Sequence, residues 1–484
     1  MKKVLIPTKL DRVARDTLTA HGGYEVIQDD SGDVSGLAAR HPDAYALIVR
    51  SEPVGPEIMD RLPQLKVIIR AGAGYNTIDT KYARKRGIDV MNTPGANANA
   101  VAEEVIALML ADARHLIRAD ASCRAGEWEK KAFMGREIAG KTVGIVGLGN
   151  IGRLVARRLS GFDCTLLGHD PMISRERAAE MEVELVDLPT LFERSDYVTL
   201  HVPETNETRK MVNAALLGRM KPGATLINCA RAGIVDEEAL RQIKPVKGLR
   251  FLNDVYPKDE PGPKSVADIA DIMLPHLGAN TREANAMAAQ RAAEQLIEFD
   301  EKGIASYIVN RAVPAGLDEA YGDLAYTLAR LCRLVVGEDA PLKLIETSFY
   351  GDLKPFADWL LVPTVAALGT DFDRASDHRA AVEYLDGKGI RYNNRETDES
   401  KGYGNAITVD LTAGAPAGAM RSASVRGTVT ERTLTVSRIN DFHRLYFEPR
   451  GHTAIFCYRD RPGVLGRIGG AIAAAGINIE DLRM

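Results

Sequence analysis

The stretch that decides the fold is KTVGIVGLGNIG, residues 141–152. TVGIV has the apolar texture of a buried strand, and the IGRLVARRLSGF segment that overlaps its end has the pattern of a helix. A GxGxxG motif joins them: its first glycine permits a tight turn, its second lets a pyrophosphate approach, and its third lets helix and strand pack. The loop that would hold the phosphates comprises Gly147, Gly149, Asn150, Ile151 and Gly152. This context predicts a dinucleotide-binding βαβ unit.

Asp170 closes the next predicted strand, about twenty residues beyond the loop. A carboxylate at this point can accept hydrogen bonds from both ribose hydroxyls, and it repels a 2′-phosphate. The cofactor is therefore predicted to be NAD rather than NADP. The alternative is a structural glycine turn followed by a surface aspartate.

Strands and helices alternate on both sides of the glycine loop. Helices are expected from Ala98 to about Ile117, over about 282–302 and over about 320–337. The expected strands include 4–7, 45–49, 66–70, 164–170, 197–202, 224–230, 249–255 and 272–275. Repeated βα units predict an α/β protein with two doubly wound parallel-sheet (Rossmann-like) domains. Beyond residue 312, alternating runs such as AITVDLTA predict α+β C-terminal domains.

The domain boundaries follow from these patterns. We expect the helix at 282–302 to return the chain to its first domain, which is then discontinuous. AVPAGLD, residues 312–318, reads as a linker, and the last 34 residues read strand, turn, helix, strand. The predicted domains are 1–97 with 282–311 (substrate binding), 98–281 (NAD binding), 312–450 (intervening α+β) and 451–484 (a short terminal domain).

Composition excludes several classes of protein. The chain has 484 residues, 45% hydrophobic and 26% charged, and a net charge of −4, so strong binding to nucleic acid or anionic membranes is not expected. No apolar run approaches the roughly 20 residues that span a bilayer, and the apolar run after MKK is too short for a signal peptide. We expect a cytoplasmic protein. The five cysteines form no CxxC pair, so neither a disulfide framework nor a metal site is predicted.

Three further motifs follow predicted strands and should face the cofactor, because ligands bind at the carboxyl ends of parallel strands. INCARAGIVDEEAL supplies Arg231, whose guanidinium can bind a carboxylate bidentately. NDVYPKDEP supplies Asp254 and Glu260, and LPHLGANT supplies His276. A histidine can take a hydroxyl proton near neutral pH, and a neighbouring carboxylate fixes its tautomer. Taken singly, each residue is more often structural or solvated, but their order behind a dinucleotide loop favours a 2-hydroxy acid dehydrogenase.

At this point the chain resembles the D-isomer-specific 2-hydroxyacid dehydrogenases. The resemblance covers about residues 1–310 and rests on IIRAGAGYNTID, NTPGANANAVAEE, GKTVGIVGLGNIG, LHVPETNETRKMVN, the arginine motif and PHLGANT. It implies that Arg231, Glu260 and His276 are catalytic and that Asp254 meets the nicotinamide carboxamide. It adds these cofactor-binding residues: His201, Val202, Pro203, Cys229, Ala230, Gly278 and Ala279. The implied substrate-binding residues are Arg50, Ser51, Ala71, Gly72, Gly74 and Asn97.

The chain departs from the family at Ala232, where glycine usually follows the catalytic arginine. It also continues for about 170 residues beyond the resemblance, and the extension resembles the regulatory part of long members that oxidise 3-phosphoglycerate. YRDRPGVLGRIG…GINIE is typical of ACT domains, so 451–484 is a partial ACT-like domain. The expected substrate is 3-phospho-D-glycerate. The alternatives are a hydroxypyruvate or glyoxylate reductase and a non-catalytic, NAD-sensing corepressor.

The ACT resemblance also implies an effector and an assembly. L-serine would contact Tyr458, Asp460 and Asn478, and the family implies a dimer or a tetramer. One alternative is that Arg461-Pro462-Gly463 only starts a helix, and another is that the extension serves only for oligomerisation. Because half an ACT domain leaves sheet edges open, we expect a catalytically competent chain that responds poorly to serine.

Overall fold

The computed structural model describes residues 1–205, 207–302, 307–338, 340–369, 371–414, 420–430, 433–449, 453–456, 458–459 and 461–479. The chain divides into two compact units, which are taken in turn below. One unit comprises residues 1–312, 339–343 and 368–392, and the other comprises 313–338, 344–367 and 393–484. Within the described ranges, no helix is both long and apolar enough to cross a membrane.

The first unit begins with a five-stranded parallel sheet in the order β2-β1-β3-β4-β5. Its strands are short and mostly buried, as parallel strands covered on both faces must be. Val4 and Ile6 face a core shared with α1 and α12, whereas Leu5 faces a second core under α2 and α3. The elements are β1 (Lys2–Ile6), α1 (Arg12–His21), β2 (Tyr24–Gln28), α2 (Val34–Arg40), β3 (Ala46–Val49), α3 (Pro56–Asp60), β4 (Val67–Arg70), α4 (Thr80–Lys85) and β5 (Asp89–Asn92).

A seven-stranded parallel sheet follows, in the order β12-β11-β10-β9-β6-β7-β8. The chain first builds from β6 toward β8 and then crosses to β9, so the strand order reverses between β6 and β9. The elements are β6 (Thr142–Val146), α7 (Gly152–Leu159), η2 (Ser160–Phe162), β7 (Thr165–His169), α8 (Arg175–Glu180), β8 (Val183–Leu185), α9 (Leu188–Arg194), β9 (Tyr197–Leu200), α10 (Ala214–Arg219), β10 (Thr225–Asn228), η3 (Ala232–Ile234), α11 (Glu237–Lys247), β11 (Arg250–Asn253) and β12 (Ile272–Met273). This topology confirms the predicted doubly wound fold and places the switch point between β6 and β9, where ligands bind in such folds.

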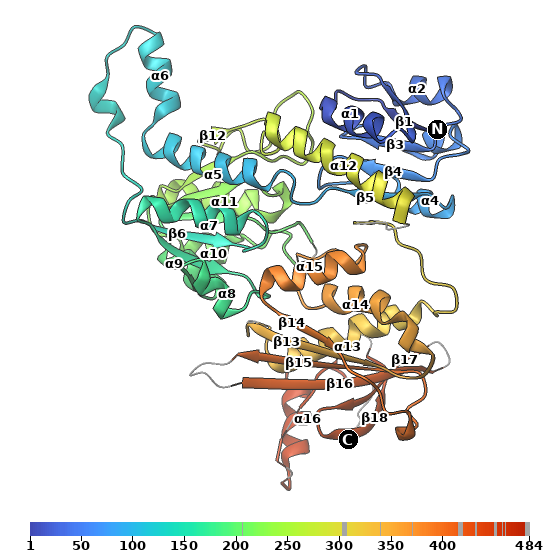
Figure 1. Ribbon diagram of the computed structural model, residues 1–484. Helices are drawn as coiled ribbons and strands as arrows, with labels where there is room; N and C mark the ends of the chain where they lie inside the picture. Colours follow the sequence, from blue (N-terminus) through green and yellow to red (C-terminus); the bar gives the residue numbers. More distant parts are fainter. Residues whose placement is uncertain are drawn as a thin grey trace. The chain divides into compact units, whose positions relative to one another are not determined.

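Two helices connect the sheets. Helix α5 (Ala98–Ala113) packs on the second sheet beside α7, and α12 (Arg282–Lys302) lies against α1 (Figure 1). After α12 the chain returns to β5, where the Val309 amide donates to the carbonyl of Val90 over 2.8 Å. The expected continuation of the first helix to Ile117 is wrong. It ends at Ala113 because His115 takes a left-handed conformation, with φ of +53°, before α6 (Leu116–Arg124) begins.

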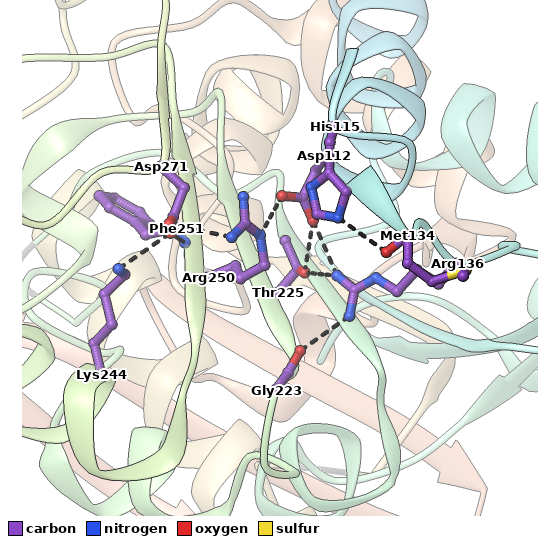
Figure 2. Close-up of polar contacts among 10 residues, drawn as sticks. All are labelled: Asp112, His115, Met134, Arg136, Gly223, Thr225, Lys244, Arg250, Phe251 and Asp271. Carbon is purple, nitrogen blue, oxygen red and sulfur yellow. Dashed lines mark hydrogen bonds and ion pairs between the residues drawn. The ribbon is translucent and has the colours of Figure 1, made fainter. Parts of the chain in front are cut away.

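An arm made of α6, η1 (Lys130–Phe133) and their connections extends from the second sheet (Figure 1). A polar network at the amino ends of β10 and β11 fastens its return (Figure 2). Arg136 donates to the buried Asp112 over 2.9 Å and to Thr225 over 2.6 Å, and Arg250 also pairs with Asp112. Arg250 and Lys244 in turn both pair with Asp271. The arm is thus tied to the end of the sheet opposite the glycine loop.

The second unit is built around a mixed sheet in the order β14-β13-β15-β16-β17-β18, to which residues of both units contribute. Strands β15 to β18 are antiparallel, and α13 packs on β15, β16 and β17. The elements are α13 (Ala320–Val336), β13 (Leu342–Phe349), η4 (Gly351–Phe356), α14 (Ala357–Ala366), β14 (Arg391–Asn394), η5 (Glu399–Lys401), β15 (Ala406–Gly414), β16 (Met420–Thr430), β17 (Thr433–Ile439) and β18 (Phe442–Phe447). Helix α15 (His378–Lys388) falls in the first unit.

The last described segment holds helix α16 (Val464–Ala474). None of its residues is buried, and Leu465, Ile477 and Ile479 are between 40% and 61% exposed. The strands expected on either side of it do not occur at 453–456 or 477–479. A strand needs a hydrogen-bonding partner, and the described part of this segment offers none.

Candidate active site

The glycine loop joins β6 to α7 at the switch point of the sheet. Gly147 has φ of +91°, and a Cβ atom there would stand 2.6 Å from the carbonyl oxygen of His201. A Cβ atom on Gly152 would stand 2.0 Å from the carbonyl oxygen of Gly147. At Gly149, by contrast, the nearest atom to an added Cβ is Asp371 Oδ2 at 4.0 Å. Two glycines are therefore required for packing, whereas the middle one has room beside it, an arrangement that fits the close approach of a pyrophosphate.

Asp170 follows β7 and is buried, as a ribose-binding carboxylate at this position should be. Its oxygens already have partners: Leu148 N–H donates to Oδ2 over 2.8 Å, and Met172 N–H donates to Oδ1 over 2.9 Å. The ammonium group of Lys388, at the end of α15, pairs with Asp170 and with Asp371, the latter over 2.7 Å. Sequence reasoning missed Lys388, which lies more than 200 residues from Asp170. If Asp170 binds ribose as predicted, the hydroxyls share it with this ammonium group or displace the ammonium group.

The HVP segment lies directly after β9, across the switch point from the glycine loop. His201 is deeply placed: Nε2 lies 3.0 Å from the hydroxyl of Thr199, and burial lowers the pKa of the imidazole to about 3. His201 is therefore neutral at physiological pH. Val202 approaches Gly147, as the adenine-pocket prediction requires, although nothing in the described structure tests that role.

Three arginines gather near one another: Arg50 and Arg70 come from the first sheet, and Arg231 comes from the loop after β10 of the second sheet. Arg70 Nε donates to the carbonyl of Arg50 over 2.8 Å, and its guanidinium lies over Gly72, where a Cβ atom would clash with Nη1 at 1.4 Å. Arg231 Nη2 lies 4.0 Å from the position of a Cβ on Gly74. Burial first, and then the positive charges of Arg50 and Arg231, lower the pKa of Arg70 to about 10. Such a cluster suits a substrate with two anionic groups.

The other predicted substrate residues frame this cluster. Ser51 is exposed next to Arg50, and Ala71 is buried at the start of the glycine turn. Asn97 caps α5 without a side-chain hydrogen bond to the helix, so its amide is not used for capping. Ala232 begins the short helix η3, and its φ is not positive, so the backbone there does not require glycine.

His276 follows β12 and forms a close pair with a carboxylate, but not with the expected one. Its Nδ1 lies 2.6 Å from Oδ2 of Asp259. Glu260 is exposed, and its carboxylate lies 3.8 Å from the ammonium group of Lys258, so the structure does not bring it against His276 and its catalytic role stays a prediction. The two acidic residues are neighbours in a loop, and only the path of the backbone decides which one faces the histidine. With Nδ1 engaged, Nε2 is the nitrogen left to exchange a proton with a substrate.

Asp254 follows β11 and holds the turn that carries His276. The Leu277 N–H donates to Asp254 Oδ1 over 2.8 Å, and the Gly278 N–H donates to Oδ2 over 3.1 Å. His276 itself has φ of +57°, a conformation that costs energy for a residue with a Cβ. The two hydrogen bonds from the following amides offset this cost, so Asp254 fixes the position of the imidazole.

The remaining cofactor residues lie where the sequence places them. Cys229 and Ala230 follow β10 and are buried, and Ala279 follows the His276 turn. The predicted effector residues Tyr458 and Asn478 are exposed, and Asp460 lies outside the described residues.

Comparison with known proteins shows the family of the chain. The family described as "D-isomer specific 2-hydroxyacid dehydrogenase, NAD binding domain" matches residues 106–278, and the ACT domain family matches 452–483. The D-3-phosphoglycerate dehydrogenase of Mycobacterium tuberculosis is 34% identical over 491 residues, which cover 98% of this chain and 90% of the relative. The chain belongs to the D-isomer specific 2-hydroxyacid dehydrogenase family. It is an NAD-dependent dehydrogenase, as predicted, and carries an ACT domain.

Two further comparisons concern the catalytic part. The hydroxypyruvate reductase of Thermotoga maritima is 42% identical over 311 residues, covering 62% of this chain and 99% of the relative. The NAD-bound 3-phosphoglycerate dehydrogenase of Entamoeba histolytica is 30% identical, with a TM-score of 0.53, and covers 64% of this chain and 99% of its own. The catalytic part alone is therefore similar to enzymes of more than one name, whereas the similarity over the full length is to D-3-phosphoglycerate dehydrogenases.

Proposed function

We propose that this chain oxidises 3-phospho-D-glycerate to 3-phosphohydroxypyruvate with NAD. The observation that carries the proposal is the similarity to D-3-phosphoglycerate dehydrogenases over 98% of the chain, which includes the extension beyond the catalytic part. The arginine cluster supports it, because this substrate carries both a carboxylate and a phosphate. In the proposed arrangement Arg231 binds the carboxylate, Arg50 and Arg70 meet the phosphate, and the glycine turn after β4 offers backbone N–H groups.

Oxidation of the 2-hydroxyl group requires one proton acceptor and one hydride acceptor. His276 would take the proton of the 2-hydroxyl group at Nε2 while the hydrogen at C2 leaves as hydride. Asp259 keeps the imidazole in the required tautomer and stabilises the imidazolium that forms. Bound NAD supplies the hydride acceptor at its nicotinamide ring. The glycine loop, Asp170 and Asp254 would hold its pyrophosphate, ribose and carboxamide, respectively.

The competing function is reduction of hydroxypyruvate or glyoxylate, which the 42% identity to the Thermotoga enzyme favours over the catalytic part. A substrate panel separates the two. We expect kcat/KM for 3-phosphoglycerate to exceed that for glycerate, lactate and 2-hydroxyglutarate by at least about tenfold, because only the phosphate engages Arg50 and Arg70. A matched variant, Arg70→Met, should reduce this preference. Equal kcat/KM values for glycerate and 3-phosphoglycerate would contradict the proposal.

The arm formed by α6 and η1 is a candidate surface for assembly. The arm exposes large apolar side chains, namely Leu116 (53%), Ile117 (55%), Trp128 (87%) and Met134 (83%). Exposed apolar groups gathered on one projection are typical of a protein interface, so we propose that the arm forms a homodimer contact. Sedimentation of Trp128→Glu against the unaltered chain tests this. A cytoplasmic location is proposed with it.

A further inference from the structure

The first half of α5 carries a buried carboxyl group that the mechanism above does not use. Glu104 lies on the apolar stripe of the helix with Val101, Val105 and Leu108, and both of its carboxyl oxygens are buried. Neither oxygen accepts a hydrogen bond from an N–H group of the described residues. An unpaired carboxylate in such a place is costly, so its surroundings require an explanation.

Those surroundings are the carboxyl ends of β10 and β11, where the nicotinamide is proposed to bind. The Glu104 carboxyl lies beside the carboxyl of Asp254 and the thiol of Cys229. A Cβ atom on Gly278 would stand 3.2 Å from Glu104 Oε2 and 3.6 Å from Asp254 Oδ2, so both carboxyl groups meet at the turn that follows His276. Two adjacent carboxyl groups shielded from water cannot both ionise easily, and the stable state shares one proton between them.

The charge of the pair follows from its contacts. Burial first, and then the charge of Asp254, raise the pKa of Glu104 to about 8. Burial also raises the pKa of Asp254, but the hydrogen bonds that it accepts from Leu277 and Gly278 oppose this effect, and Glu104 has no such N–H donors among the described residues. The proton therefore resides on Glu104 at neutral pH, and the two residues together carry a single negative charge.

We propose that Glu104 is a positioning residue of the hydride-transfer site, which holds the shared proton so that Asp254 stays oriented toward the cofactor carboxamide and the His276 turn. The proposal rests on the proposed function only in placing the nicotinamide beside Asp254. Loss of the proton puts a second negative charge at this point. The oxidised nicotinamide ring is a cation and the reduced ring is neutral, so ionised Glu104 favours binding of NAD⁺ over NADH.

The test compares cofactor affinities across pH on the full chain. The other titratable groups that face this point are Asp254, Cys229 and, through Asp254, His276. Dissociation constants for NAD⁺ and NADH are measured by calorimetry from pH 6.5 to 9 for the unaltered chain and two variants. Glu104→Gln keeps a donor toward Asp254 but cannot ionise. Glu103→Gln is the matched control, because Glu103 is the preceding residue and is 62% exposed.

We expect the ratio Kd(NADH)/Kd(NAD⁺) of the unaltered chain to rise about tenfold between pH 7 and 9, the change that a one-unit shift in pKa produces. Glu103→Gln should behave in the same way, and Glu104→Gln should lose this rise in the ratio between pH 7 and 9. Infrared difference spectra on NAD⁺ binding at pH 7 should show a protonated-carboxyl band that Glu104→Gln lacks. The proposal is overturned if Glu104→Gln follows the unaltered chain in both measurements. Failure of the proposed function would instead appear as absent turnover of 3-phosphoglycerate.

Discussion

Helix α5 carries one buried carboxyl group at each end of the NAD-binding sheet, and the two have opposite surroundings. Asp112, about two turns after Glu104, meets Arg136, Arg250 and the hydroxyl of Thr225 at the amino ends of the strands (Figure 2). Glu104 meets another carboxyl group at the carboxyl ends. At the amino end the buried charge has partners of opposite sign, and this network stabilises the fold. The carboxyl end keeps groups whose partners come with the cofactor and substrate, and five predictions test this division.

The largest effect is expected at the carboxyl end. His276→Asn should lower kcat by about 10²–10⁴-fold, the usual contribution of a general acid–base group. Because the glycine loop and Asp170 are untouched, NAD should bind with an affinity close to that of the unaltered chain. Steady-state kinetics and calorimetric titration with NAD check both points. Turnover within a few-fold of the unaltered chain would exclude His276 as the proton carrier.

At the amino end the expected loss is in stability instead. Asp112→Asn should lower the free energy of unfolding by about 2–3 kcal/mol, somewhat less than for a fully buried pair, because both guanidiniums are partly exposed. Denaturant titration measures this loss, and kcat should stay within about twofold of the unaltered chain.

Glu104→Gln should behave differently. Because the pKa of Glu104 is raised in the folded state, the stability of the unaltered chain should fall as pH rises from about 4.5 to about 8. Glu104→Gln lacks this group, so its stability relative to the unaltered chain should be higher at pH 8 than at pH 5. If Glu104→Gln lowered the free energy of unfolding as much as Asp112→Asn does, the two carboxyl groups would not differ as described.

Within the carboxyl end, two neighbouring residues should differ. Asp259→Asn should lower kcat/KM by about tenfold, because the imidazole loses its orienting carboxylate. Glu260→Gln is the control and should leave kcat/KM unchanged. If Glu260→Gln lowered kcat/KM and Asp259→Asn did not, Glu260 would be the functional partner of His276.

One fully paired ion cluster does occur at the carboxyl end, and it should respond to the cofactor. Lys388→Met removes the ammonium group between Asp170 and Asp371 and should lower Tm in the absence of NAD. With saturating NAD the loss should shrink, because ribose hydroxyls replace the lost donor to Asp170. Thermal scans with and without NAD measure the difference, and Lys343→Met, which removes a surface ion pair, is the control. An equal loss in both conditions would mean that the ribose does not use Asp170.

The smallest effect concerns the C-terminal segment. Serine should inhibit this chain only weakly, because no residue of α16 is buried and the predicted contacts Tyr458 and Asn478 are exposed. A serine titration of the forward reaction decides this. Strong inhibition that disappears on Asp460→Ala would show that the segment forms a working effector site.

The sequence predicts what local patterning controls. GxGxxG between an apolar strand and a helix predicts β6, the loop and α7, and the strands that place Arg231, Asp254 and His276 are all found within about two residues of their expected ends. β2 and β5 are missed because each has only four or five residues and includes polar ones.

The site contacts were harder to predict, for different reasons in each case. Asp259 and Glu260 are adjacent and chemically alike, so no pattern distinguishes them. Lys388 reaches Asp170 only through tertiary structure. Glu104 and Asp112 could have been found, because each is an acidic residue on an otherwise apolar helical stripe, a pattern that indicates a buried charge in need of a partner.

The position of Cys229 has a consequence for chemical labelling. Burial and two neighbouring carboxyl groups raise the pKa of its thiol, and the thiolate is the form that reacts with electrophiles. A cysteine at the centre of the active site should therefore resist alkylation at neutral pH. Cys123, on the arm, is the exposed cysteine among those described. A thiol-reactive spin label or fluorophore added to the unaltered chain should attach mainly there, and it would report on the arm without disturbing catalysis.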